Sequence, residues 1–460
     1  MMKAKMSLVI LGLFAMVQLT NAQANTDECR TTLSIFSEHY KVKNYKAAFE
    51  PWKKVYTECP DFHIATYAYG PKIVEYMIEN EGSAAEKEGY KKLLMEVYEN
   101  RMKYFASKTK IGDIKSKMGD AMMKHKMGAP DKVIAVYDEA FTKDRKNFKN
   151  PKSLYNYFDL YYKQHEAGKV SLEDLFTKYE ELSEKFEEES KSLAGQLKTI
   201  LQKEDAGTPL TSKEKRTKKR AETNVKAIGI FSGNLDALIS AKASCENLVP
   251  LYQKNFDTNK TNAVWLRRAA SRMVKKECTK DPMFFKLVES LTAVDPSAGT
   301  LRLAGKLAEE QKKYDNALEY YNQAVDMYED SFDKAKIYLT IANLAKKRGQ
   351  KSKARNYANK ALAEDPSMGK AYLLIATLYG SSANQCGNST FEKKSVYWLA
   401  ADTARKAGRV DASLRSRANK LANSYDARVP SKSEIFNGGM AGKSLSIGCW
   451  IGRTIKVPNL

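Results

Sequence analysis

The chain has 460 residues, of which 43% are hydrophobic, and its formal net charge is +22. The hydrophobic content lies in the ordinary globular range, which excludes disorder as the default state. The charge favours anionic partners such as acidic peptides, lipid head groups or cell-wall polymers, although widely spread lysines are also typical of a solvated basic surface.

The first residues have the pattern of an export signal. Lys3 and Lys5 precede an apolar run from Leu8 to Val17, and small or polar residues follow from Thr20 to Ala24. This order predicts a cleaved signal peptide over residues 1–22. The run is too short to span a bilayer, and no later run is long enough, so no transmembrane segment is expected. We expect an exported protein, periplasmic or associated with the outer membrane of a Gram-negative bacterium, or secreted as the alternative. Export makes nucleic acid the least expected partner.

The remaining chain is predicted to form helices in two arrays. Residues 25–190 show apolar residues at helical spacing, interrupted by short turns, and predict an N-terminal helical array. Residues 191–224 are expected to be a charged linker region, because an acidic run from Glu180 to Glu189 is followed by a basic run from Thr211 to Arg220. Residues 225–428 predict a second helical array.

Within the second array, the sequence from Ala298 to Pro366 repeats itself. Small and apolar residues three and four apart share one helical face, the alanines let two helices approach closely, and a proline ends the pair. The second copy consists of Tyr338, Ile341, Ala342, Ala345, Ala354, Ala358, Ala361 and Pro366. The copy before it consists of Leu301, Ala304, Gly305, Ala308, Ala317, Tyr321 and Ala324.

This spacing resembles the tetratricopeptide repeat. A further copy near the N-terminus has the same register: Thr32, Ile35, Phe36, His39, Ala48, Trp52, Val55 and Pro60. The clearest repeats cover residues 298–379. The resemblance implies an all-α fold, an α-solenoid of helical hairpins, whose first helices line a concave groove that binds a protein or peptide.

The resemblance also implies where a peptide would bind. In some family members, lysine and asparagine side chains in the groove hold an acidic peptide C-terminus, and the matching positions here carry suitable donors for a carboxylate. Leu339 and Leu374 stand where further polar groups would help, so this chain departs from a full carboxylate clamp. The alternative is that these are ordinary surface residues. The expected groove residues are Arg302, Lys306, Asn343 and Lys370.

Six cysteines lie beyond the expected signal peptide, and an exported chain with an even number favours three disulfides. In the helical pairs that the resemblance implies, Cys29 and Cys59 come together at the base of one hairpin, and Cys245 and Cys278 recur at nearly the same separation. Cys386 and Cys449 remain as the third pair. Free buried thiols are the alternative; a zinc site is not expected, because no Cys-x-x-Cys sequence occurs.

Residues 429–460 differ from the helical arrays. Apolar residues alternate with others from Leu445 to Ile451 and again at Ile455 and Val457, which predicts a small β-hairpin. We expect the hairpin to be attached by the bond between Cys386 and Cys449 and to cap the last repeat, because the end of a solenoid would otherwise expose its packing face.

No pattern points to catalysis or to a cofactor. The four histidines lie in separate predicted helices, and no Gly-x-Ser-x-Gly sequence occurs. The string Gly439 to Ser444 is similar to a phosphate-binding loop, but Asn437 occupies the place of its first glycine. We therefore expect no enzyme, metal or cofactor.

Three functions remain in order of preference. The first is an exported scaffold for protein–protein interactions, in an envelope assembly or with an exported client. The alternative is a charge-driven binder of anionic envelope material such as cell wall or lipopolysaccharide. An enzyme that uses a carboxylate pair comes last, because no spacing selects such a pair.

Overall fold

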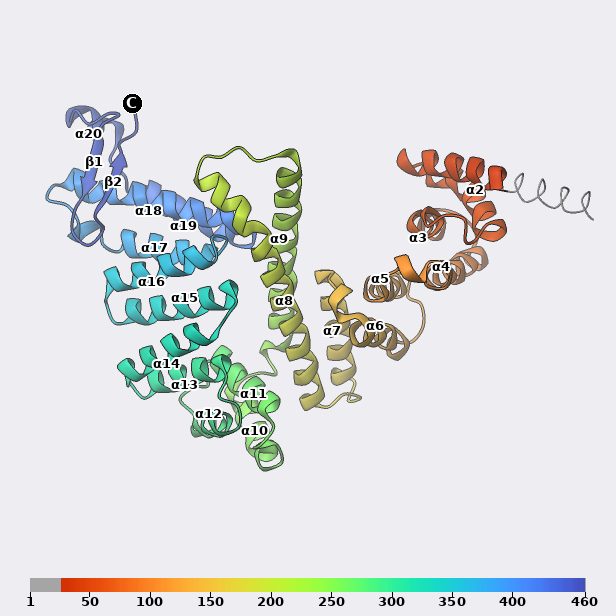
Figure 1. Cartoon of the computed structure of the whole chain (residues 1–460), viewed down its shortest axis with the longest axis horizontal. Helices are drawn as coiled ribbons and strands as arrows, with labels where there is room; N and C mark the ends of the chain where they lie inside the picture. Colours follow the sequence, from red (N-terminus) through yellow and green to blue (C-terminus); the bar gives the residue numbers. More distant parts are fainter. Residues whose placement is uncertain (1–25, 460) are drawn as a thin grey trace, which may run out of the picture. The chain divides into compact units, whose positions relative to one another are not determined.

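The computed structural model describes residues 26–459 (Figure 1). The expected signal peptide, residues 1–22, lies outside them. Contacts between residues divide the chain after Gln164. We call residues 26–164 unit 1 and residues 165–459 unit 2.

Unit 1 consists of consecutive helices joined by short turns. Neighbouring helices pack as antiparallel pairs, such as α3 with α4 and α5 with α6. The α-helices cover residues 26–41, α2 (Tyr45–Glu58), α3 (Ala65–Asn80), α4 (Ala84–Tyr104), α5 (Ile111–Lys124), α6 (Pro130–Asp144) and α7 (Pro151–Glu166), with 3-10 turns at Ala106–Lys108 and Arg145–Asn147.

A tryptophan shows how these helices fit together. Trp52 of α2 is fully buried, and its indole N–H donates a hydrogen bond of 2.7 Å to the carbonyl oxygen of Thr66. A Cβ atom at Gly70 would lie 2.8 Å from the indole ring, so only glycine lets α3 approach so closely. Gly70 therefore sets the packing of α2 against α3.

Unit 2 contains the repeats, in which α11 packs on α12, α13 on α14, α15 on α16, and α17 on α18. Its helices are α8 (Leu172–Asp205), α9 (Ser212–Ser240), α10 (Cys245–Asn259), α11 (Ala263–Lys275), α12 (Pro282–Val294), α13 (Ala298–Glu310), α14 (Tyr314–Met327), α15 (Ser331–Lys347), α16 (Lys351–Glu364), α17 (Gly369–Gly380), α18 (Thr390–Val410), α19 (Arg415–Asp426) and α20 (Lys432–Asn437), with 3-10 turns at Ala383–Gln385 and Ala412–Leu414.

The alanine seam predicted from the repeats is present. Ala342 and Ala345 of α15 are buried in one cluster with Ala354, Ala358 and Ala361 of α16. Because these side chains are small, the two helices approach closely and bury apolar surface with little side-chain entropy lost. The prediction of an all-α solenoid of helical hairpins is confirmed. Within residues 26–459, no helix has the length and apolar character needed to cross a bilayer.

The structure differs from the expected charged linker over residues 191–224. This segment belongs to two long helices, α8 and α9, which pack against each other and are joined only by residues 206–211. Thr211 starts α9 with a capping box, in which its side chain accepts from the N–H of Glu214. Both helices bury apolar residues, among them Leu197 of α8 and Ile228 of α9. Both charged runs belong to helices, and contacts between residues divide the chain after Gln164.

The three disulfides join the predicted pairs: Cys29 with Cys59, Cys245 with Cys278, and Cys386 with Cys449. No cysteine in the described part of the chain is free. The first two bonds each connect the ends of neighbouring helical segments, as the repeat geometry implied.

The C-terminal hairpin is also present. Strand β1 (Ser444–Ile447) pairs antiparallel with β2 (Arg453–Lys456), with Leu445 opposite Ile455. Ile447 and Ile451 are buried in the cluster formed by α15 to α18. The hairpin thus covers apolar surface at the end of the repeats.

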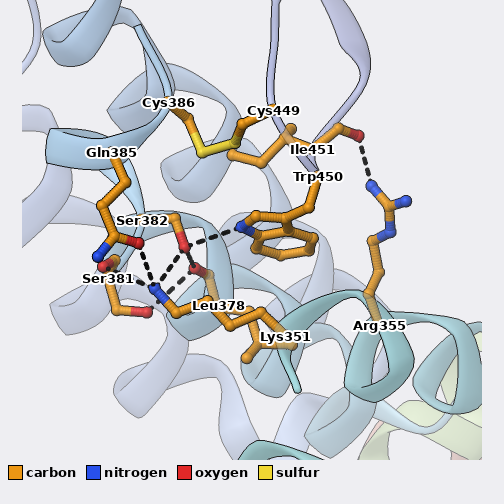
Figure 2. Close-up of a disulfide and its surroundings, with 10 residues drawn as sticks. All are labelled: Lys351, Arg355, Leu378, Ser381, Ser382, Gln385, Cys386, Cys449, Trp450 and Ile451. Atoms are coloured by element: carbon orange, nitrogen blue, oxygen red, sulfur yellow. Dashed lines mark hydrogen bonds between the residues drawn. A yellow bond between two sulfur atoms is a disulfide. The ribbon is translucent and has the colours of Figure 1, made fainter. Parts of the chain in front are cut away.

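Figure 2 shows how the hairpin is attached. The disulfide holds Cys449 beside Cys386, and the indole N–H of the next residue, Trp450, donates to Ser382 Oγ at 3.2 Å. Lys351 Nζ donates to the same hydroxyl oxygen at 2.9 Å, and Arg355 donates to the carbonyl oxygen of Ile451. The disulfide is one part of a polar network around a half-buried indole.

Removing this disulfide is expected to loosen the tail. The double substitution Cys386→Ser and Cys449→Ser should lower the free energy of unfolding by about 2–4 kcal/mol, because the segment between the two cysteines regains its freedom in the unfolded chain. Limited proteolysis should then cut within residues 429–460 first. The matched control, Cys245→Ser with Cys278→Ser, should leave the tail resistant. A tail that stays resistant without its own disulfide would contradict this prediction.

Candidate functional site

The four expected groove residues lie on first helices of successive pairs in unit 2: Arg302 and Lys306 on α13, Asn343 on α15 and Lys370 on α17. No hydrogen bond within residues 26–459 joins any two of them. Lys306 forms an ion pair of 2.8 Å with Glu310 of its own helix, and Asn343 donates to the carbonyl oxygen of Leu339, also of its own helix. The structure therefore does not bring the four side chains together into one cluster.

Helix α8 runs beside the helices of the unit 2 array (Figure 1), and its acidic run pairs with basic side chains of α11 and α15. Glu184 forms an ion pair of 2.9 Å with Arg268 of α11, and Glu187 pairs with Lys336 of α15. Further along α8, Lys191 pairs with Asp333 at 2.9 Å. The sequence suggested an acidic partner for this part of unit 2, and α8 supplies acidic side chains from within the chain.

The deepest of these contacts is an ion pair between α8 and α11. Arg272 is only 5% exposed and donates to Glu180 at 2.8 Å, to the hydroxyl of Tyr252 at 2.7 Å and to the carbonyl oxygen of Phe176 at 3.1 Å. Burial raises the pKa of the Glu180 carboxyl, while Arg272 opposes that shift. The contacts with Glu180 and Phe176 fix α8 to α11, and the contact with Tyr252 joins α10, so we assign this cluster a structural role.

Unit 1 contains a hollow between its helices. Its volume is about 420 Å³, and its lining comes mainly from three successive first helices, α3, α5 and α7. We call it the unit 1 hollow. The polar residues that line it are Glu75, Lys117, Asp120, Lys124, Lys152 and Asn156.

Asp120 organises one side of the hollow. One carboxylate oxygen accepts from the hydroxyl of Tyr137 at 2.6 Å and from the amide of Asn156 at 2.9 Å, and the other accepts from the hydroxyl of Ser153 at 2.6 Å. These donors come from α6 and α7, so Asp120 ties three helices together. It also fixes the orientation of the Asn156 amide.

Lys124 organises the other side. Its Nζ lies 2.6 Å from Glu79 and 3.3 Å from Glu75, and the hydrogen bond from Lys124 lowers the pKa of Glu79. Burial lowers the pKa of the neighbouring His125, so this imidazole is neutral at pH 7 and adds no positive charge. The charge of Lys124 is thus balanced within unit 1.

Two lysines leave positive charge at the hollow. Lys152 is exposed and forms no ion pair within residues 26–459, and Lys117 pairs at 2.8 Å only with the exposed Asp113 of its own helix. Lys152 and Asn156 are four residues apart on α7, so they share one face of the helix. An ammonium group beside an oriented amide can bind a carboxylate.

The two carboxylates in the hollow are already engaged. Asp120 accepts three hydrogen bonds, and Glu75 faces Lys124. A general base needs a free acceptor within reach of its substrate, so this pair does not provide one. No group of three or more histidine, cysteine, aspartate or glutamate side chains within residues 26–459 has an arrangement that could hold a metal ion.

Residues 297–363 match a family model of the tetratricopeptide repeat. These residues therefore form tetratricopeptide repeats. A curated relative, the photosystem I assembly protein Ycf3 of Cyanophora paradoxa, is 29% identical over 102 residues, which are 20% of this chain and 59% of that protein. The match thus spans about three-fifths of the length of this relative.

Solved structures of other proteins show weaker similarity to this chain. A complex of the TPR2AB domain of yeast Sti1 with pHSP90 is 17% identical, with 68% of this chain and 98% of that chain covered and a TM-score of 0.23. Yeast Tom70 is 12% identical, with 87% and 89% covered and a TM-score of 0.30. These scores are too low to establish a shared arrangement of the whole chain.

Sequence reasoning missed the unit 1 hollow because it followed the clearest tetratricopeptide repeats. The available signal was the pair Lys152 and Asn156, which lie four residues apart on a first helix, together with Lys117 on the preceding first helix. The role of Asp120 had no local signal, because its partners Tyr137 and Ser153 are 17 and 33 residues away.

Proposed function

We propose that this protein is an exported scaffold that binds a protein partner in the unit 1 hollow, as part of an envelope assembly or with an exported client. The observation that carries the proposal is the pair Lys152 and Asn156 beside a hollow lined by three successive first helices. The first helices of tetratricopeptide repeats form a concave binding face in the family, and this part of it carries an unpaired cation.

The chemistry of the hollow favours an acidic segment or a C-terminal carboxylate. Lys152 supplies a charge, and the Asn156 amide, held by Asp120, supplies a donor of fixed orientation. Preorganised donors bind better because little side-chain entropy is lost on binding. In unit 2, by contrast, Arg268 and Lys336 already pair with α8, which favours unit 1 for the partner.

Two observations support export. The N-terminal sequence has the pattern of a signal peptide, and three disulfides are typical of proteins that fold in an oxidising compartment. An exported scaffold would meet partners of the cell envelope.

The double substitution Lys152→Glu and Asn156→Ala is expected to weaken partner binding about 10- to 100-fold, because it removes two donors and adds a repelling charge. Affinity capture from the native envelope, with mass-spectrometric identification, would find the partner. Titration of that partner with the purified proteins would give the ratio of the dissociation constants of the variant and the unchanged protein. The matched control is Lys420→Glu with Asn419→Ala, which makes the same changes on exposed positions of α19. Equal binding by both variants would contradict the proposed site.

A further inference from the structure

The first half of α9 carries a basic face. Six lysine and arginine side chains in four helical turns are exposed, and none forms an ion pair within residues 26–459. They share about half of the helix circumference, since their positions are separated mainly by three, four or seven residues. We call this set the α9 basic face: Lys213, Lys215, Arg216, Lys219, Arg220 and Lys226.

The opposite side of α9 is used for packing. Ala221 and Ile228 are buried, and Lys218 pairs with Glu204 of α8 at 2.6 Å. The two acidic residues of the segment are also engaged: Glu214 pairs with Lys203 at 2.6 Å and Glu222 with Lys218 at 3.8 Å. Ion pairs within the chain therefore lie toward α8, while the α9 basic face keeps its full charge.

The shape of this face suits a flat anionic surface. At 1.5 Å per residue, the six cations extend over roughly 20 Å along one helix, and none of them lines the unit 1 hollow or the hollow between α8, α10 and α11. A convex row of cations can approach many anionic groups at once only if these lie in one surface or along one polymer. Its field concentrates such groups near the protein.

An exposed apolar side chain favours a bilayer surface over a soluble anionic polymer as the partner of the α9 basic face. Ile230 is 50% exposed and continues the same face, four residues after Lys226. A water-soluble polyanion offers nothing to an isoleucine, whereas the interface of a bilayer takes up an apolar side chain beside its charged head groups.

We propose that the α9 basic face docks on an anionic lipid bilayer, with Ile230 inserted between head groups. This inference is independent of the partner that the unit 1 hollow binds, because the two surfaces share no residue. Attraction of basic side chains to an anionic leaflet strengthens binding about fivefold per lysine or arginine near the surface, and it weakens as salt screens the charges.

Sedimentation of the mature full-length protein with vesicles tests the proposal. The protein should bind vesicles of phosphatidylcholine in which about one lipid in three is the anionic phosphatidylglycerol. It should not bind vesicles of pure phosphatidylcholine. Neutralising four cations, with Lys215→Gln, Arg216→Gln, Lys219→Gln and Lys226→Gln, should reduce the partition coefficient at least about 100-fold. Ile230→Ser should reduce it severalfold without altering binding of soluble polyphosphate.

A matched control removes the same charge from scattered exposed positions. Lys132→Gln, Lys313→Gln, Arg417→Gln and Lys420→Gln should change vesicle binding far less than the α9 variant, and thermal melting followed by circular dichroism should show both variants folded. Equal loss in the two variants would overturn the proposal, since net charge would then explain binding. So would binding to polyphosphate without binding to anionic vesicles, which would assign the face to a soluble polymer.

Discussion

Replacing Arg272 with methionine is expected to lower the free energy of unfolding of unit 2 by about 3–5 kcal/mol. The substitution removes a buried guanidinium that contacts Glu180, Tyr252 and the backbone of Phe176, and leaves the Glu180 carboxylate buried without its counterion. Urea denaturation would measure the loss, and hydrogen exchange would locate it in α8 and α11.

The loss should depend on pH. Burial already raises the pKa of Glu180 above its ordinary value of 4.5, and without Arg272 the rise becomes larger. A carboxyl whose pKa is raised by folding destabilises the folded state above that pKa, and it has no such effect once both states are protonated. The deficit of the variant is therefore expected to be largest at neutral pH and to shrink as the pH falls toward 4.5.

Two variants serve as controls. Arg268→Met breaks the partly exposed pair with Glu184 and should cost at most about 1 kcal/mol. The double variant Arg272→Met with Glu180→Met should recover much of the lost stability, because no charge remains buried alone. If Arg272→Met were no worse than Arg268→Met, the structural role of the buried pair would be refuted.

Replacing Trp52 with alanine is expected to destabilise unit 1 by about 3–5 kcal/mol. The indole is fully buried between α2 and α3, and its N–H satisfies the carbonyl oxygen of Thr66. Because Gly70 leaves no side chain to fill the space, the cavity cannot close without moving a helix. Hydrogen exchange within residues 26–164 would measure the change.

The control for this site is Trp52→Phe. Phenylalanine keeps most of the buried area but loses the hydrogen bond, so the expected loss is about 1–2 kcal/mol. If the phenylalanine and alanine variants were equally stable, the packing of the indole against Gly70 would not be what holds α2 to α3.

Much of the fold was predictable because the deciding contacts are local and periodic. Ala342 and Ala358 are 16 residues apart, within one helix pair, and their spacing from other small residues predicted the buried seam. The disulfide between Cys245 and Cys278 followed from the same geometry, since antiparallel helices bring their outer ends together. The alternation of apolar with other residues from Leu445 onward predicted the hairpin, because its two strands are also close in the sequence.

The position of α8 could not be predicted in this way. Glu180 and Arg272 are 92 residues apart, and nothing in their local sequence connects them. The basic run of α9 was predicted to belong to a charged linker over residues 191–224, because charge alone does not distinguish the exposed face of a helix from a coil. The unit 1 hollow escaped prediction for a related reason: its residues gather from helices whose repeat signature is weak.

The contacts of α8 also bear on how the protein can be divided for experiments. A fragment trimmed to the most recognisable part of the array, such as residues 245–428, would lack Glu180, Glu184 and Glu187. Arg268, Arg272 and Lys336 would then face water without counterions. Such a fragment would bind acidic peptides that the intact chain does not bind. Ligands found with it would occupy the place of the acidic run of α8 and would not be ligands of the whole protein.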